Sequence, residues 1–239
     1  MVTLGKAIYS VGFWIRRTGL AIDRMGSRIQ GNYQFQQPRK ALSNPRLPLF
    51  PDPCLRSSVS RHRTLMKIFD KVPVVDKDAF VAPSASLIGD VQVGQHSSIW
   101  YGCVLRGDVN SIIIGSGTNI QDCSIVHVAK HNPSGKALPT VIGDNVTVGH
   151  GAILHACTIE DEGFVGMGAT LLDGVVLEKH AMVAAGALVR QNMRIPRGEI
   201  WGGNPAKFLR KLKDEEVAFI PRSATNYWNL ARAHAAENS

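Results

Sequence analysis

The sequence predicts an all-β solenoid, a parallel β-helix of six-residue repeats, with an amphipathic helix before it and helices after it. Two observations lead to this prediction. Aliphatic residues recur at every sixth position over much of residues 81–189, and small residues, mostly glycine, often follow them. A period of six fits neither an α-helix nor an alternating strand. It fits a solenoid of short strands joined by tight corners.

The repeat runs in four registers separated by short slips. Three six-residue sides make one triangular coil, each aliphatic residue points inward, and successive coils stack as parallel strands about 4.8 Å apart. We expect the pattern to stop after Val189 and the β-helix domain to occupy residues 64–213. The aliphatic positions are Val81, Leu87, Val93, Ile99, Leu105, Ile114, Ile120, Val126, Ile142, Val148, Leu154, Ile159, Val165, Leu171, Leu177, Val183 and Val189.

The N-terminal residues 1–33 are expected to form a basic amphipathic helix. This segment is rich in arginine and poor in acidic residues, and its apolar residues have helical spacing. Such a helix is typical of mitochondrial targeting, and it also suits contact with a membrane surface or a partner. An ordinary surface helix is the third alternative. Residues 34–63 hold five prolines and are expected to be a disordered linker.

The C-terminal residues 214–239 are expected to form helices that pack on the outside of the prism. Asp214, Glu215 and Glu216 place negative charge where a helix N-terminus favours it. Pro221 is expected to interrupt the helix, and the alanine-rich residues 222–237 predict a second one.

The charge distribution argues against nucleic-acid binding, although the net charge is +8. Residues 1–63 carry eleven Lys or Arg and two acidic residues, whereas the remainder carries sixteen basic and seventeen acidic residues. The solenoid is therefore nearly neutral. The four cysteines form no CxxC pair, which favours a reducing compartment. No stretch approaches the ~20 apolar residues that span a bilayer.

Three histidines indicate a zinc-type metal site. His127 and His155 each follow an inward aliphatic residue, so the period places both outward at the same offset on adjacent coils. Two imidazoles at that spacing can share a Zn²⁺ ion. His150 lies on a different side of the prism. We therefore expect a neighbouring chain to supply it, in a cyclic trimer with a site at each interface.

The coil below these histidines adds polar side chains. The period places Arg106 beneath His127 and Asp122 beneath His150, with Gln121 beside Asp122. Arg106 is also expected to form an ion pair with Asp108. A carboxylate near a metal-binding histidine commonly orients its ring. The aspartates beside repeat glycines are expected to form turns; they are Asp90, Asp144 and Asp173.

Four motifs carry a resemblance to a known family: RGD at 106–108, NIQD at 119–122, HV at 127–128 and VGHGAILHAC at 148–157. Together they resemble gamma-class carbonic anhydrase over residues 64–237. The start of the chain and SRHRTLMKIFDK at 60–71 are similar to the gamma-carbonic-anhydrase subunits of plant mitochondrial respiratory complex I. The resemblance implies a left-handed β-helix, a homo- or heterotrimer with related subunits, and a place on the complex I membrane arm, at the matrix side of the inner membrane.

The resemblance also implies an activity, the reversible hydration of CO₂ to bicarbonate. His127 and His155 of one subunit and His150 of the next would bind Zn²⁺ or another divalent ion such as Fe²⁺ or Co²⁺. The ion would lower the pKa of a bound water so that hydroxide attacks CO₂. Gln121 would hydrogen-bond the nucleophile or the product. The other residues implied around the site are Arg106, Asp108, Asp122 and Tyr227.

The sequence departs from the pattern at the acidic residues that shuttle protons in well-characterised members. Val109 follows Asp108, and the loop at 128–140 has no carboxylate. We therefore expect catalysis to be slow or absent. A catalytically silent structural subunit of complex I is the first alternative. A hexapeptide acyltransferase is the second, and it leaves the three histidines unexplained.

Overall fold

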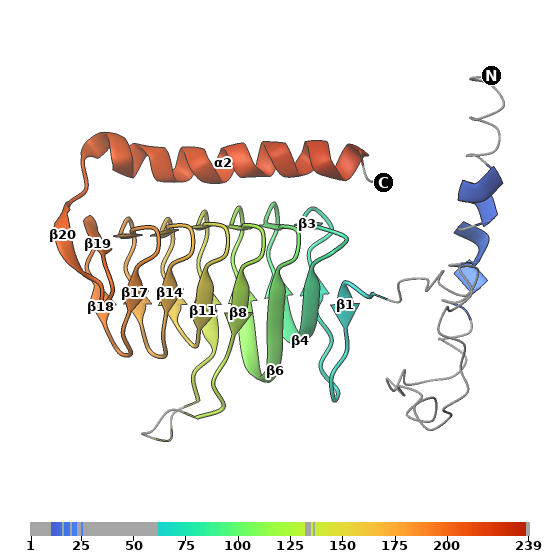
Figure 1. Cartoon of the computed structure of the whole chain (residues 1–239), viewed down its shortest axis with the longest axis horizontal. Helices are drawn as coiled ribbons and strands as arrows, with labels where there is room; N and C mark the ends of the chain where they lie inside the picture. The colour runs from blue at the N-terminus through green and yellow to red at the C-terminus, as the bar shows by residue number, and fades with distance from the viewer. Residues whose placement is uncertain are drawn as a thin grey trace, which may run out of the picture. The chain divides into compact units, whose positions relative to one another are not determined.

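In the computed structural model, a parallel β-solenoid carries one long helix, α2 (Asp214–Glu237), along one of its sides (Figure 1). The structure describes residues 11–15, 17–19, 21–22, 25, 62–131, 135 and 137–237. Residues 60–239 form one compact unit, and residues 1–59 form another. The predicted parallel β-helix of hexapeptide repeats with a C-terminal helix is confirmed.

Strand pairing divides the solenoid into three faces. The long strands β4 (Ser86–Val93) and β6 (Val104–Ile114) turn a corner and contribute to the first and second faces. The first face also contains β1 (Leu65–Met66), β8 (Ile125–His127), β11 (Ile153–His155), β14 (Thr170–Leu171) and β17 (Leu188–Val189). The second contains β2 (Val74–Val75), β9 (Thr140–Ile142), β12 (Thr158–Ile159), β15 (Val176–Leu177) and β18 (Arg194–Ile195).

The third face lies beneath α2. Its parallel strands are β3 (Phe80–Val81), β5 (Ser98–Ile99), β7 (Asn119–Ile120), β10 (Thr147–Val148), β13 (Phe164–Val165), β16 (Met182–Val183) and β19 (Glu199–Gly202). The strand β20 (Lys207–Lys211) closes this face by pairing antiparallel with β19. The chain then enters α2, which contacts β3, β5, β7 and β10.

The core of the solenoid is the stack of inward aliphatic residues that the period predicted. Every predicted position from Leu87 to Val189 is buried, and Val81 is partly buried against the same core. Burial of each such side chain stabilises the fold by about 1.5–3 kcal/mol. A second inward residue lies two positions earlier in each side and is usually small or β-branched, as at Ala169 and Val175.

The glycines after the aliphatic residues allow coils to stack closely at one corner. A Cβ atom at Gly115 would lie 2.7 Å from the Gly143 backbone and 2.3 Å from the Asp144 carboxylate. A Cβ at Gly94 would lie 2.6 Å from the Gly115 carbonyl oxygen. Side chains larger than hydrogen would push these coils apart.

The expected end of the repeat at Val189 is wrong. Ile195 and Trp201 continue the six-residue spacing on β18 and β19, and Ile195 is fully buried. Ile195 fits the aliphatic count and extends the core by one position, whereas Trp201 is aromatic and does not fit that count.

The expected break at Pro221 is also wrong, because α2 is one continuous helix through it. A proline inside a helix removes one hydrogen bond and costs about 3 kcal/mol. The buried face of α2 offsets this cost by packing Ile220, Ala224 and Ala231 against the solenoid.

The described residues of the N-terminal unit are helical, at 11–15, 17–19, 21–22 and 25. Their large apolar side chains are exposed, Trp14 by 70 % and Ile15 by 68 %. Targeting and membrane contact stay predictions. Residues 34–61 of the expected linker lie outside the described residues. Within the described parts of the chain, no helix has the length and apolar character needed to cross a membrane.

Candidate metal centre

His127 and His155 form the centre of the site on the first face. They end strands β8 and β11, and their Cα atoms are paired in the parallel register. Val126 and Leu154 point into the core, so the strand alternation turns the next residue outward. The ring centroids of the two histidines lie 5.1 Å apart. The period alone predicted this pair.

Arg106 and Asp108 flank His127 from the coil below. Arg106 on β6 is the Cα partner of His127, and its guanidinium forms an ion pair with Asp108. Asp108 Oδ1 lies 3.2 Å from His127 Nε2. Burial acts to raise the pKa of Asp108, but hydrogen bonds from His127, Arg106 and the Val109 N–H together lower it. Burial lowers the pKa of His127, which favours the neutral imidazole that metal binding requires.

Asp173 flanks His155 from the coil above. Its Oδ1 atom lies 2.5 Å from His155 Nδ1. We expected Asp173 to be a turn former only, and the structure corrects that expectation. Asp144 does act in a turn, since its Oδ1 accepts a hydrogen bond from the Ser116 N–H. The period places residues 172 and 173 one coil above His155. The six-residue count that predicts the histidine pair could therefore also have indicated the contact between Asp173 and His155.

His150 lies away from that pair, in the corner turn between β10 and β11. Asp122 occupies the equivalent turn one coil below, and its Oδ2 atom lies 2.8 Å from His150 Nδ1. The predicted stacking of Asp122 beneath His150 is therefore present. Asp122 Oδ1 also accepts a hydrogen bond from the Tyr101 N–H, at 3.2 Å.

Gln121 and Tyr227 lie next to Asp122. Gln121 is 4 % exposed, and its amide donates to Asn119 Oδ1 at 3.0 Å. Tyr227 on α2 forms a side-chain hydrogen bond with Gln121. Burial and the charge of Asp122 raise the pKa of Tyr227, so its hydroxyl stays protonated at neutral pH. The helix thus fixes one wall beside His150.

The candidate residues of one chain therefore lie in two separate groups. Within the described residues, no group of three His, Cys, Asp or Glu side chains could hold an ion. The pair His127 and His155 lies on the first face, and His150 lies at a corner with Asp122 and Gln121.

The whole chain is similar to a curated protein. Gamma carbonic anhydrase 1, mitochondrial, from Arabidopsis thaliana is 68 % identical over 239 residues, which is 100 % of this chain and 80 % of that protein. The chain belongs to the gamma carbonic anhydrase family.

The chain also resembles further proteins over its solenoid. A probable carbonic anhydrase from Methanocaldococcus jannaschii is 43 % identical over 158 residues, or 66 % of this chain and 96 % of that protein. A crystal structure of a hexapeptide transferase family protein from Anaplasma phagocytophilum has a TM-score of 0.67 at 46 % identity. The matched region covers 71 % of this chain and 97 % of the Anaplasma chain. No family model matches the chain.

Gamma carbonic anhydrases are metal-dependent, and the donor atoms present fit a metal. Each candidate histidine directs one ring nitrogen at a carboxylate, which is Nδ1 in His150 and His155 and Nε2 in His127, and the other ring nitrogen is left to bind an ion. Metal-binding histidines in proteins usually have this arrangement. The donor set is made of imidazoles, which suit zinc and other divalent transition metals.

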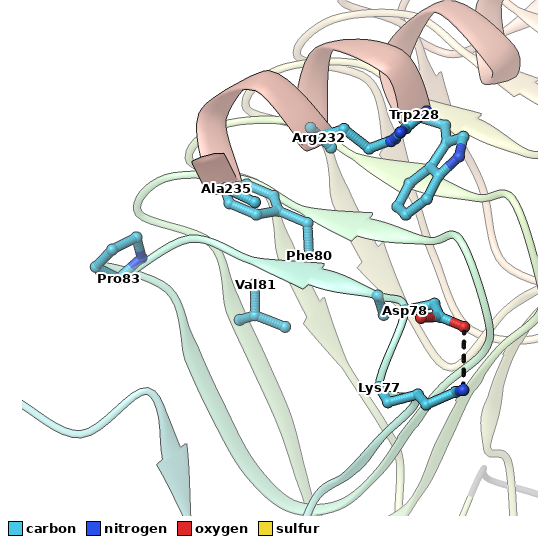
Figure 2. Close-up of a pocket in the computed structure, with 10 residues that line it drawn as sticks. Lys77, Asp78, Phe80, Val81, Pro83, Trp228, Arg232 and Ala235 are labelled. Carbon is cyan, nitrogen blue, oxygen red and sulfur yellow. Dashed lines mark ion pairs between the residues drawn. The ribbon is translucent and has the colours of Figure 1, made fainter. Parts of the chain in front are cut away.

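Two cavities lie where α2 meets the third face of the solenoid. One, of about 480 Å³, has Gln121, His150 and Tyr227 in its lining. The other, of about 360 Å³, lies near the end of the helix and includes none of the predicted site residues. Figure 2 shows this second cavity, with Phe80 and Trp228 in its wall and the ion pair of Lys77 and Asp78 at its edge.

Proposed function

We propose that this chain is a gamma-type carbonic anhydrase subunit that catalyses the reversible hydration of CO₂ to bicarbonate at the interface of a trimer. His127 and His155 of one subunit and His150 of a neighbour hold the metal. The observation that carries the proposal is the division of these histidines into a register-matched pair and a separate corner histidine. A neighbouring copy completes each site, and a closed ring of three gives three equal sites.

Zn²⁺ is the proposed metal, with Fe²⁺ or Co²⁺ as other divalent ions for the same donors. A bound ion supplies the Lewis acidity that activates water for attack on CO₂. The protein residues hold the ligands in place. Asp173 orients the ring of His155, and Asp122 orients that of His150.

Gln121 is the proposed substrate-positioning residue. Its amide is held by Asn119 and Tyr227, so its orientation is fixed before substrate arrives. A fixed donor or acceptor can stabilise developing charge without rearranging. Arg106 and Asp108 form an ion pair beside His127, which places a fixed carboxylate at the metal pair.

The proposed location is the mitochondrion, at the matrix side of the inner membrane, on the membrane arm of respiratory complex I. The full-length match to a mitochondrial relative includes the basic N-terminal segment, which supports this location. The trimer contains either identical chains or related gamma-type subunits. The N-terminal helix is proposed to contact the membrane surface peripherally.

A silent structural subunit of complex I is the second candidate. The absence of carboxylates from the loop at 128–140 and from position 109 favours it, because fast turnover needs a proton path to solvent. An acyltransferase is disfavoured, since that function leaves the three histidines without a role.

Metal analysis and a CO₂ hydration assay on the purified protein test the proposal. We expect about one divalent ion per chain and hydration above the uncatalysed rate. Stoichiometric metal with no hydration at any buffer concentration would favour the structural subunit instead.

A further inference from the structure

The larger cavity between α2 and the third face runs across several coils of the solenoid. Phe164, Met182 and Ile200 lie in register on β13, β16 and β19 and line it. Phe219 and Tyr227 line it from α2, and the Phe164 and Phe219 rings are 6.2 Å apart. With coils about 4.8 Å apart, those three strands extend the apolar surface by about 10 Å.

The lining of this cavity includes one histidine, His150. Among the described residues, it contains no Lys, Arg, Asp or Glu. Phe164, Met182 and Ile200 form an apolar region, whereas Gln121, His150 and Tyr227 gather around the candidate metal site. Transfer of an ion to such a region without a partner is strongly unfavourable. The chemistry therefore selects a neutral, largely apolar ligand and disfavours anions such as bicarbonate or a nucleotide phosphate.

We infer that this cavity binds CO₂ as a neutral molecule and delivers it to the site at His150. The inference rests on the proposed function and deepens it, because it assigns substrate binding to the apolar residues beneath α2. CO₂ has no net charge and requires no hydrogen-bond donor to enter an apolar region. Bicarbonate is charged, so the same lining disfavours its return and directs product toward solvent.

The rim of the cavity fits this assignment. Met167 is 58 % exposed and Phe219 is 40 % exposed, so apolar side chains border the entrance as well as the interior. In the proposed trimer, the neighbour that brings its histidine pair to His150 approaches this end of the cavity. The alternative occupant is a side chain of that neighbour, which would fill the space and exclude gas.

Crystals of the metal-loaded protein, pressurised with xenon and separately with CO₂, test binding without any turnover. Apolar cavities in proteins take up xenon. We expect density for both gases beside Phe164, Met182 and Ile200. The inference is overturned if the cavity shows neither gas, if xenon enters but CO₂ does not, or if a neighbouring chain fills the space.

Two variants that fill the cavity provide the second arm of the test. Ala184→Leu and Ile200→Phe should each remove the gas density, and either one suffices if the other does not fold. Ala235→Leu is the matched control, because it adds the same side chain to the smaller cavity in Figure 2. Gas density in the larger cavity should persist in this control.

Kinetics separate this inference from the proposed function. If the wild type hydrates CO₂, Ala184→Leu should lower kcat/KM about ten-fold, mainly through KM, with metal content unchanged. An unchanged kcat/KM in a variant that has lost the gas density would overturn the inference. A wild type without turnover contradicts the proposed function alone, and the CO₂-pressurised crystals still decide whether the cavity binds CO₂.

Discussion

His127 and His155 are Cα partners on adjacent parallel strands, and their ring centroids lie 5.1 Å apart. Two imidazoles this close can share one ion at about 2.0–2.1 Å per nitrogen. Within the described residues of the same chain, no third ligand joins them. If a neighbour completes the site, metal binding and assembly are coupled, because the ion links two chains.

Replacing His155 by alanine tests that coupling. We expect His155→Ala to lose the metal, because two remaining imidazoles make a weak site. We also expect the trimer of the variant to dissociate at protein concentrations at which the wild-type trimer stays intact. Elemental analysis measures the metal, and light scattering across a dilution series measures the assembly.

His131→Ala is the matched control for this variant. His131 is an exposed histidine that is not in register with the pair, so metal content and assembly should match the wild type. Full metal content in His155→Ala, or loss of metal in both variants, would contradict the assigned ligands.

Replacing Asp173 by asparagine tests how the ring of His155 is oriented. The carboxylate lies 2.5 Å from His155 Nδ1 and favours the tautomer whose Nε2 atom is free to bind metal. Loss of such a partner weakens metal affinity by about 10- to 100-fold. Competition with a metal chelator measures this change.

Asp161→Asn is the control for Asp173→Asn. Asp161 also accepts a hydrogen bond on the solenoid surface, from the Asp144 N–H at 2.9 Å, but it does not contact the candidate ligands. Equal affinity in both variants would assign Asp173 to a turn and not to the metal site.

Much of the solenoid was predictable because one period governs both the core and the register. The six-residue count that predicts the burial of Leu154 and Val126 also predicts the pairing of the histidines that follow them. It failed at Trp201, where an aromatic residue takes an aliphatic position. The separate prediction of a helix break at Pro221 was also wrong, because the packing of α2 overrides the local preference of proline.

The site was less predictable than the core because side-chain direction in turns does not follow the period. Asp173 and Asp144 occupy similar places beside repeat glycines, yet one contacts a histidine and the other a backbone N–H. The hydrogen bond between Tyr227 and Gln121 depends on how α2 lies along the third face. The sequence gives no distance between those two elements.

The start of α2 gives a prediction about pH. Arg210 donates two hydrogen bonds to the Glu216 carboxylate, at 2.7 and 2.8 Å, and the Lys213 N–H donates a third. These bonds lower the pKa of Glu216 from 4.5 to about 2. A lowered pKa in the folded state stabilises the protein above pH 4.5, and this contribution is lost as pH falls toward 2.

Thermal unfolding of Glu216→Gln measures that contribution. We expect a lower Tm than the wild type at neutral pH and a difference that shrinks progressively below pH 4.5. Glu215→Gln removes the same charge from the same turn and serves as the control. A Tm difference for Glu216→Gln that stays constant from pH 7 to pH 2 would contradict the ion pair.

The missing proton path gives the last prediction. Val109 follows Asp108 and is 45 % exposed, at the position where the resemblance expects an acidic residue. Without a shuttle, proton transfer to solvent limits the rate, and a diffusible base such as imidazole should accelerate the wild type. Val109→Glu supplies a carboxylate beside the site. We therefore expect it to raise kcat at low buffer concentration and to leave kcat unchanged at saturating imidazole.

Val109→Gln is the control, since it has nearly the same shape but cannot accept a proton at neutral pH. It should behave like the wild type at every buffer concentration, with the same metal content. Stopped-flow CO₂ hydration across an imidazole series measures all three proteins. An equal gain from Gln and Glu would show that position 109 acts through packing. A wild-type rate independent of imidazole would show that proton transfer is not the limiting step.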